Sequence, residues 1–262
     1  MARKSARVVV KVPSAVSDVR IETGWIQLYG GEKFFPSKPY WFPGMLRAIA
    51  RGLAAENRYC GATDQLYSVA QHSVIAALIV DPEFARAALF HDAPEGLGLK
   101  DWPRPIKETM PVAVRQWYQE SERLIIEMLA DHYGFESMWS DHFVKAVKAA
   151  DEMLLVTESR DLFSKLHADW HFQARNGYLA LPFKVDPWPW TVAEALFIWC
   201  YGFMSRIPEG VVSMLSEFNK VKDTMMTVVQ NNPSIGMADP EGGLISIVAT
   251  KLSISLDDLL RL

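Results

Sequence analysis

Residues 84–96 read FARAALFHDAPEG, an apolar segment that ends in three titratable side chains. Phe84, Ala88 and His91 follow the three-and-four spacing of one helix face. Asp92 is the next residue and lies about 100° further around the helix axis. A helix that buries its apolar side therefore carries a histidine and an aspartate toward the interior, and Glu95 follows shortly after them.

Two further segments predict helices with one polar residue inside an apolar stripe. In the helix expected over residues 64–80, His72 interrupts an apolar line. In the helix expected over residues 141–167, Asp151 lies on the side that carries Val147. Because burying an unpaired carboxylate is costly, Asp151 must be neutralised, paired with a cation or bound to a metal.

Together these positions form a candidate metal site. His72, His91, Asp92 and Asp151 offer two imidazoles and two carboxylates from three helices. A single inward histidine is more often a hydrogen-bonded core residue, and a single inward aspartate is usually half of a salt bridge. The group of four favours a metal instead. Its mixed nitrogen and oxygen ligands suit Mn, Co, Zn or Fe, and also Mg, with positions left for water and substrate.

The periodicity predicts an all-α helical bundle with a small β-hairpin near the N-terminus. Two β-prone runs, Trp25–Tyr29 and Glu32–Phe35, flank Gly30-Gly31, which predicts a two-residue hairpin turn. Helices are expected over residues 45–55, 64–80, 82–93, 111–134, 141–167 and 191–206, and a loop is expected over residues 96–110.

The chain is expected to divide into three regions. Residues 1–20 are basic and poorly patterned, which predicts a tail. Residues 21–206 hold the helical domain. Residues 207–262 form a C-terminal helical extension, whose apolar stripe we expect to contact a second copy in a homo-oligomer.

Charge and composition exclude several classes of protein. The chain of 262 residues has a formal net charge of -4, which argues against binding to polymeric nucleic acid. Its longest apolar run, residues 195–204, is well short of the roughly 20 residues that span a bilayer, so no membrane contact is expected. Two cysteines fit a reducing compartment, and the basic N-terminus lacks the apolar core of a signal peptide. We therefore expect a cytoplasmic protein.

Five segments carry a family resemblance, in the order WIQLYGGEKFFP, YSVAQHSV, ALFHDAPEG, DWPRPIK and KAADEMLL. They resemble segments of the HD superfamily of metal-dependent phosphohydrolases, in particular the HD nucleotidases related to bacterial 5'-deoxynucleotidases and phage deoxyadenosine triphosphate hydrolases. The resemblance covers residues 25–166. It implies an HD-domain helical bundle in which His72, His91, Asp92 and Asp151 are the metal ligands. The C-terminal extension lies outside it.

The same resemblance implies two catalytic carboxylates. In these enzymes a glutamate at the place of Glu95 and an aspartate at the place of Asp101 position water and exchange protons. Glu95 comes four residues after His91, so on a continuous helix it would lie one turn along the same side. The loop that leads to Asp101 is one residue longer here than in the family.

Four residues are implied as substrate contacts. Arg58 matches a family arginine that binds the substrate phosphate, and Arg104 and Lys107 follow the catalytic loop as further cations. Tyr59 stands where the family usually has a tryptophan that packs against the 2' carbon of the sugar. The resemblance thus implies a preference for deoxyribose that is weaker than a tryptophan at this position would give.

More than one function remains open at this point. The expected substrate is either a dNTP such as dATP, which loses triphosphate, or a dNMP, which loses phosphate. One alternative is another HD phosphohydrolase that acts on an alarmone or a cyclic nucleotide. Another is a non-catalytic binding module in which the metal only staples the helices together.

Overall fold

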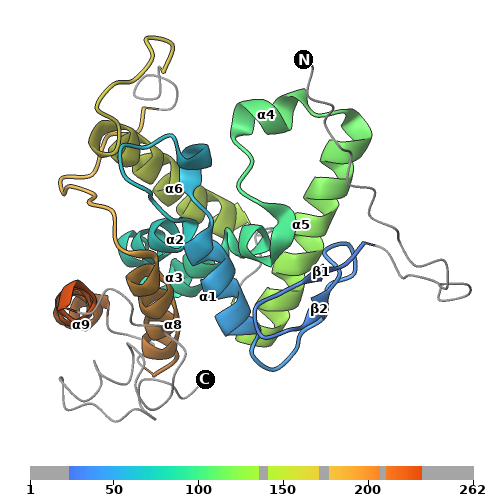
Figure 1. Cartoon of the computed structure of the whole chain (residues 1–262), viewed down its shortest axis with the longest axis horizontal. Helices are drawn as coiled ribbons and strands as arrows, with labels where there is room; N and C mark the ends of the chain where they lie inside the picture. The colour runs from blue at the N-terminus through green and yellow to red at the C-terminus, as the bar shows by residue number, and fades with distance from the viewer. Residues whose placement is uncertain (1–23, 136–140, 171–176, 207–210, 232–262) are drawn as a thin grey trace, which may run out of the picture.

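A computed structural model describes residues 24–135, 141–170, 177–206 and 211–231, which form a helical bundle with one small hairpin (Figure 1). The predicted all-α fold class with an N-terminal hairpin is confirmed. In chain order the elements are β1 (Ile26–Gln27), β2 (Lys33–Phe34), α1 (Met45–Ala55), the 3-10 turn η1 (Arg58–Gly61), α2 (Val69–Ile79), α3 (Pro82–Phe90), the wide turn η2 (Glu95–Leu99), α4 (Arg104–Thr109), α5 (Val112–Tyr133), α6 (Asp141–Asp161), α8 (Trp190–Arg206) and α9 (Val211–Asn231).

Helix α2 is the centre of the bundle. It packs against α1, α3, α6 and α8, and all of its residues except Ile79 are buried. Its buried amide Gln71 donates to the carbonyl of Asp186 at 2.8 Å and accepts the N–H of Trp188 at 2.7 Å, in the segment before α8. The next residue, His72, is fully buried as well and therefore needs polar partners of its own.

Several helix ends follow the signals in the sequence. Ser68 caps α2, with its hydroxyl accepting the N–H of Gln71 at 3.2 Å. Pro82 lies in the first turn of α3, where its missing N–H costs no hydrogen bond. Helix α5 stops at Gly134, which adopts the left-handed conformation with a φ of 66°.

Two helices are shorter than predicted. Helix α2 does not begin at residue 64, because the N–H of Asp64 donates to the carbonyl of Leu162 at 2.9 Å and holds that segment outside the helix. Helix α6 ends at Asp161 and not at residue 167. The Asp161 carboxylate there accepts the N–H of Val185 at 2.8 Å and joins the helix end to a distant loop.

The prediction of a loop over residues 96–110 is wrong, since this segment contains most of η2 and all of α4. Gly98 has a φ of 103° and lies inside the turn η2. Pro105 lies in the first turn of α4, where proline is tolerated. Helix α3 ends at Phe90, before the predicted residue 93, so that His91 and Asp92 lie in the turn that follows it.

The hairpin turn is longer than predicted. Strands β1 and β2 are antiparallel and pair Ile26 with Phe34. Because the N–H of Leu28 donates to the carbonyl of Glu32 at 2.8 Å, the loop has three residues, 29–31, and not two. Both of its glycines have a positive φ, which other residues rarely adopt.

A close backbone contact between α1 and η2 fixes the position of the turn that begins with Glu95. A Cβ atom added to Gly52 of α1 would lie 2.7 Å from the carbonyl carbon of Gly96. A Cβ atom added to Gly96 would lie 2.8 Å from Cγ of Leu53. The absence of a side chain at both positions therefore lets η2 lie directly on α1.

Helix α8 packs against α1 and α2 and closes the core, and α9 packs against α8. Helix α9 is the described part of the predicted extension, residues 207–262, while the predicted tail, residues 1–20, lies outside the described residues. The homo-oligomer contact stays a prediction.

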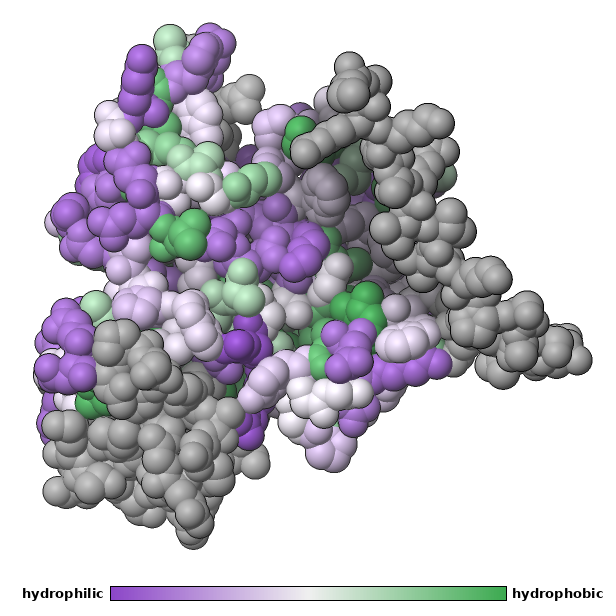
Figure 2. Space-filling model, in the orientation of Figure 1, coloured by the Kyte–Doolittle hydropathy of each residue, from purple (hydrophilic) through white to green (hydrophobic). Residues whose placement is uncertain are grey.

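Apolar groups on the face seen in Figure 2 form small islands among hydrophilic ones. Within the described ranges, no helix combines the length and the apolar character that crossing a membrane requires.

Candidate metal centre

Three helices bring the predicted ligands His72, His91 and Asp151 to one point. His72 projects from α2, Asp151 projects from α6, and His91 follows the last turn of α3. One ligand atom from each lies within 4.8 Å of the others. The Nε2 atom of His72 is 3.3 Å from Nε2 of His91 and 3.2 Å from a carboxylate oxygen of Asp151. Atoms bound to one cation at about 2 Å lie roughly 3 Å apart, so this spacing suits a shared ion.

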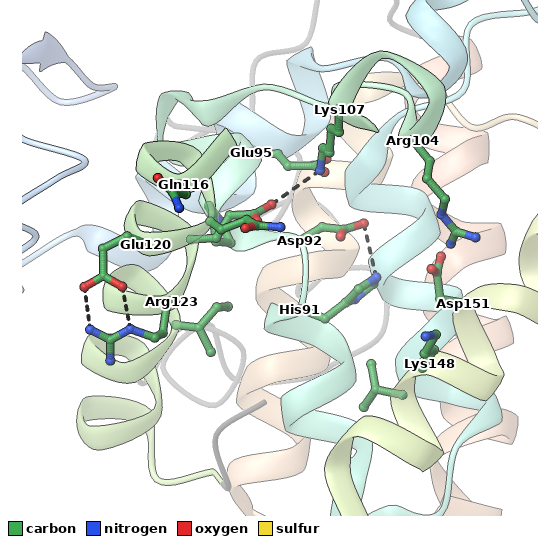
Figure 3. Close-up of a pocket in the computed structure, with 15 residues that line it drawn as sticks. His91, Asp92, Glu95, Arg104, Lys107, Gln116, Glu120, Arg123, Lys148 and Asp151 are labelled. Carbon is green, nitrogen blue, oxygen red and sulfur yellow. Dashed lines mark hydrogen bonds and ion pairs between the residues drawn. The ribbon is translucent and has the colours of Figure 1, made fainter. Parts of the chain in front are cut away.

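The fourth predicted ligand, Asp92, borders this group. Its Oδ2 atom lies 3.1 Å from Nε2 of His91 and 3.7 Å from Nε2 of His72. Figure 3 shows His91, Asp92 and Asp151 facing one another at one end of a cleft. The structure therefore brings all four predicted ligands together.

Both histidine rings are held through the nitrogen that faces away from the centre. Nδ1 of His91 lies 2.7 Å from the carbonyl oxygen of Ala88, which can only accept. Nδ1 of His72 lies 2.6 Å from a carboxylate oxygen of Glu158. In the neutral form of each ring these contacts place the proton on Nδ1, which leaves the lone pair of Nε2 for a metal at the centre.

Sequence reasoning missed Glu158, the residue behind His72. Its side chain is fully buried on α6 and lies near Arg58, Tyr59 and Tyr67 as well as His72. The signal was present, because Glu158 comes seven residues after Asp151 and continues the same stripe of the helix by two turns.

The guanidinium of Arg58 lies among three carboxylates. Its nitrogens are 3.1 Å from Glu158, 3.4 Å from Asp92 and 3.7 Å from Asp151. Burial works against its charge, but these carboxylates, Glu158 above all, and Tyr59 raise the pKa of Arg58 well above its ordinary value. The predicted phosphate-binding arginine thus lies directly beside two predicted metal ligands.

The charges in this cluster keep its carboxylates ionised. Burial raises the pKa of Asp151, but the hydrogen bond from His72 and the charge of Arg58 outweigh burial and lower that pKa to about 2. Burial and Arg58 lower the pKa of His72, but Glu158 and Asp151 outweigh them and raise it to about 9. The aspartate therefore carries the charge that a cation ligand needs.

Glu95 is in a different environment from these carboxylates. The residue is 7% exposed, and its Oε2 atom has no hydrogen-bond partner among the described residues. Burial, followed by the negative charges of Asp92 and Asp101, raises the pKa of Glu95 well above its ordinary value. Burial also raises the pKa of Asp101, which lies between η2 and α4. A carboxyl group of this kind can hold a proton near neutral pH and transfer it.

A cleft of about 860 Å³ extends from the metal centre between η2, α4, α5 and α6 (Figure 3). This volume is near the upper end of the range for small-molecule sites, roughly 300–1,000 Å³. The predicted substrate contacts Arg104 and Lys107 line it from α4. Each is held by an acidic partner, Arg104 by Glu152 at 2.9 Å and Lys107 by Glu122 at 3.3 Å.

Two further cations in the cleft were not predicted from the sequence. Arg123 of α5 is paired with Glu120 at 2.7 Å and with Glu127 at 2.6 Å. Lys148 of α6 lies one turn before Asp151 and forms no ion pair with the described residues. Among the described cations of the cleft lining, Lys148 is thus the one whose charge no carboxylate offsets at close range.

Tyr59 lies beside Arg58 with a φ of 58°, a left-handed conformation that is uncommon for tyrosine. Its hydroxyl donates to Glu158 at 2.6 Å, and the edge of its ring meets Phe163 with the ring centres 5.2 Å apart. Its ring centre is 5.5 Å from the guanidinium carbon of Arg58. Tyr59 is therefore held in a fixed orientation beside Arg58 and Glu158, and it is not among the residues that line the cleft.

Comparison with known proteins adds one relative. The uncharacterized protein YfdR of Escherichia coli (strain K12) is 34% identical over 138 residues, which are 53% of this chain and 72% of YfdR. No protein-family profile matches the chain.

Proposed function

We propose that this chain, which belongs to the same family as YfdR of Escherichia coli, is an HD-domain phosphohydrolase that hydrolyses deoxynucleotide phosphates with a divalent metal. One observation carries the proposal. His72, His91 and Asp151 meet within 4.8 Å, with Asp92 beside them, at the end of a cleft in which Glu95 has a raised pKa. Binding and proton-transfer groups thus lie where one substrate can reach both.

The side chains present fit a divalent metal. His72, His91, Asp92 and Asp151 would hold it, and the hydrogen bonds of both rings through Nδ1 support this assignment. Mn, Co, Zn and Fe accept such mixed ligands, and Mg is also possible with carboxylates. When bound, the metal polarises a phosphoryl oxygen and lowers the pKa of water.

The carboxyl groups of Glu95 and Asp101 supply the proton transfers. Because Glu95 is buried against other negative charges, it keeps its proton at a higher pH than an ordinary glutamate. It can accept a proton from the attacking water or give one to the leaving oxygen. Asp101 raises the pKa of Glu95 through its charge and has a raised pKa itself, and we assign it to orient water and exchange protons with Glu95.

Cations in the cleft and beside the metal centre would bind the substrate's phosphate. Arg58 is nearest to the metal ligands and presents a planar fork of donors, the geometry that phosphate oxygens accept. Arg104 and Lys107 lie further along the cleft. Tyr59 is expected to meet the sugar and to favour deoxyribose, as the resemblance to deoxynucleotidases implies. The candidate substrates are dNMPs and dNTPs, including dATP.

The setting of this activity follows from composition. We expect a cytoplasmic enzyme that acts on free nucleotides as a homo-oligomer, with α9 in the contact between copies. Gel filtration with light scattering on the full chain tests the oligomer, and a monomeric mass would contradict it.

A substrate panel tests the proposed activity. Purified protein is incubated with each dNMP, dNTP, rNMP and rNTP in the presence of Mn, Co, Zn, Fe or Mg, and the released ion is identified. Release of phosphate or triphosphate from deoxynucleotides, with little release from ribonucleotides and none in the presence of a chelator, is expected. If no nucleotide is hydrolysed with any metal, the proposed function is wrong.

A further inference from the structure

We propose that Glu158 is a positioning residue of the metal centre, which sets the orientation of His72 and of Arg58 through its two separate oxygens. The inference rests on the proposed function only in taking the four-residue cluster as a metal site. It does not depend on which phosphate compound is hydrolysed.

Glu158 accepts hydrogen bonds from four donors. Its Oε1 atom lies 2.6 Å from Nδ1 of His72 and 2.9 Å from the hydroxyl of Tyr67. Its Oε2 atom lies 3.1 Å from Nε of Arg58 and 2.6 Å from the hydroxyl of Tyr59. A carboxylate offers about four lone-pair positions and no donor, so all of its capacity is used. Since the side chain is fully buried, water cannot replace a lost partner.

The Oε1 side fixes the metal ligand. An ionised carboxylate cannot donate, so Nδ1 of His72 carries a proton, and Nε2 of the neutral ring keeps a lone pair for a metal. That Nε2 atom faces the centre, 3.2 Å from Asp151 and 3.3 Å from Nε2 of His91. In carboxylate–histidine–metal arrangements, losing the carboxylate typically weakens metal affinity by roughly 10–100-fold.

The Oε2 side fixes the cation. Glu158 holds Nε of Arg58, while the two terminal nitrogens of the same guanidinium point to Asp92 and Asp151. The plane of the fork is therefore set from behind by a residue that itself lies outside the cleft lining. The hydroxyl of Tyr59 occupies the other position on this oxygen, which holds a residue of strained backbone in place.

These contacts explain why a carboxylate is required at residue 158. In Glu158→Gln the side chain keeps its shape, but one oxygen becomes an amide N–H₂ group. In either orientation of the amide, its N–H₂ group faces two other donors, which are His72 and Tyr67 on one side or Arg58 and Tyr59 on the other. If the amide nitrogen faces His72, the ring loses the acceptor that fixes its tautomer. If it faces Arg58, the guanidinium loses its anchor.

Two variants separate the effect on His72 from a general loss of packing. Tyr67→Phe removes one donor from the same oxygen and leaves the contact between His72 and Glu158 in place. Glu158→Asp keeps a carboxylate, which only accepts, but shortens its reach. Asp186→Asn changes an exposed carboxylate far along the sequence and serves as the unaffected control.

The test measures metal binding and the tautomer of His72 separately from turnover. The full chain is titrated with Co²⁺, and the absorption spectrum gives the dissociation constant. The ¹⁵N shifts of the His72 ring, recorded above pH 9 where the ring is neutral, report which nitrogen carries the proton. Glu158→Gln is expected to bind Co²⁺ roughly 10–100-fold more weakly than the unmodified chain and to lose the single Nδ1–H tautomer. Tyr67→Phe is expected to keep that tautomer and to change the affinity by less than about threefold.

Each outcome decides a different claim. Unchanged Co²⁺ affinity and an unchanged His72 tautomer in a folded Glu158→Gln protein would overturn the role of Glu158. If Glu158→Gln does not fold, Glu158→Asp is measured instead. A Glu158→Asp protein with the same Co²⁺ affinity and the same His72 tautomer as the unmodified chain would equally overturn the role of Glu158. If the unmodified chain binds Co²⁺ and hydrolyses no nucleotide, the proposed function fails while weaker binding by Glu158→Gln still supports this inference.

Discussion

Replacing Gly52 by alanine tests how the bundle positions Glu95. At an exposed position inside a helix, such a change stabilises a protein by up to about 1 kcal/mol. Here the added Cβ atom would lie 2.7 Å from the carbonyl carbon of Gly96 and 2.8 Å from its Cα atom. Both are backbone atoms, which cannot rotate away as a side chain can. Overpacking of this kind costs about 1–3 kcal/mol, so a net loss of stability is expected.

The cost can appear in either of two measurements. If η2 stays in place, urea denaturation will give a free energy of unfolding about 1–2 kcal/mol below that of the unmodified chain. If η2 moves away from α1, Glu95 moves with it, and a shift near 1 Å is expected to lower turnover by roughly 100-fold. A Gly52→Ala protein that is more stable than the original and equally active would refute this account of the contact between Gly52 and Gly96.

Three further changes have defined outcomes. Burial against α1 raises the pKa of Glu194 from 4.5 to about 7, although Arg51 opposes the shift. The folded state therefore holds a proton that the unfolded state releases, so the free energy of unfolding should fall by up to about 3 kcal/mol as the pH rises from about 4.5 to 8. In urea titrations, Glu194→Gln should remove this dependence on pH. Lys148→Ala removes the cleft cation that has no ion pair with the described residues, and it should raise KM roughly tenfold with little change in kcat. An unchanged KM would exclude Lys148 from substrate binding. Arg58→Ala leaves three carboxylates without their shared cation, so the free energy of unfolding should fall by about 3–5 kcal/mol, and a loss below about 1 kcal/mol would contradict the ion-pair geometry.

The sequence predicted the cluster of His72, His91 and Asp151 because helical periodicity is a local property. His72 and Asp151 are polar residues in apolar stripes, and each stripe can be read without knowing what lies opposite. Glu158 belongs to the same stripe as Asp151, and following the stripe by two more turns would have included it. The stripe cannot indicate that Glu158 contacts Nδ1 of His72, the ring nitrogen that faces away from the metal centre.

The missed parts of the site depend on contacts between distant segments. The turn η1 places Tyr59 and Cys60 in left-handed conformations that neither residue type favours, so no local signal predicted the position of Arg58. The sequence placed Gly96 at the start of a predicted loop. Its role is visible only when Gly52 of α1 lies against it.

The charge of the cleft was equally difficult to predict. Arg104 and Lys107 follow the site residues in the sequence and were correctly singled out as cations near them. Their partners Glu152 and Glu122 come from α6 and α5, which only the tertiary fold brings near. Lys148 has no distinguishing sequence pattern, since one lysine on a helix is usually an exposed surface residue.

The central claim is that the carboxyl group of Glu95 supplies the proton transfer that hydrolysis at the metal cluster requires. The comparison of Glu95→Gln with the unmodified chain tests this claim most directly. Metal affinity and turnover are measured on the same preparations with the best deoxynucleotide substrate. The account predicts that Glu95→Gln binds the metal as the original does and loses turnover by roughly 10²–10⁴-fold, the usual contribution of a general acid or base. A Glu95→Gln protein that hydrolyses the substrate at the original rate would contradict it.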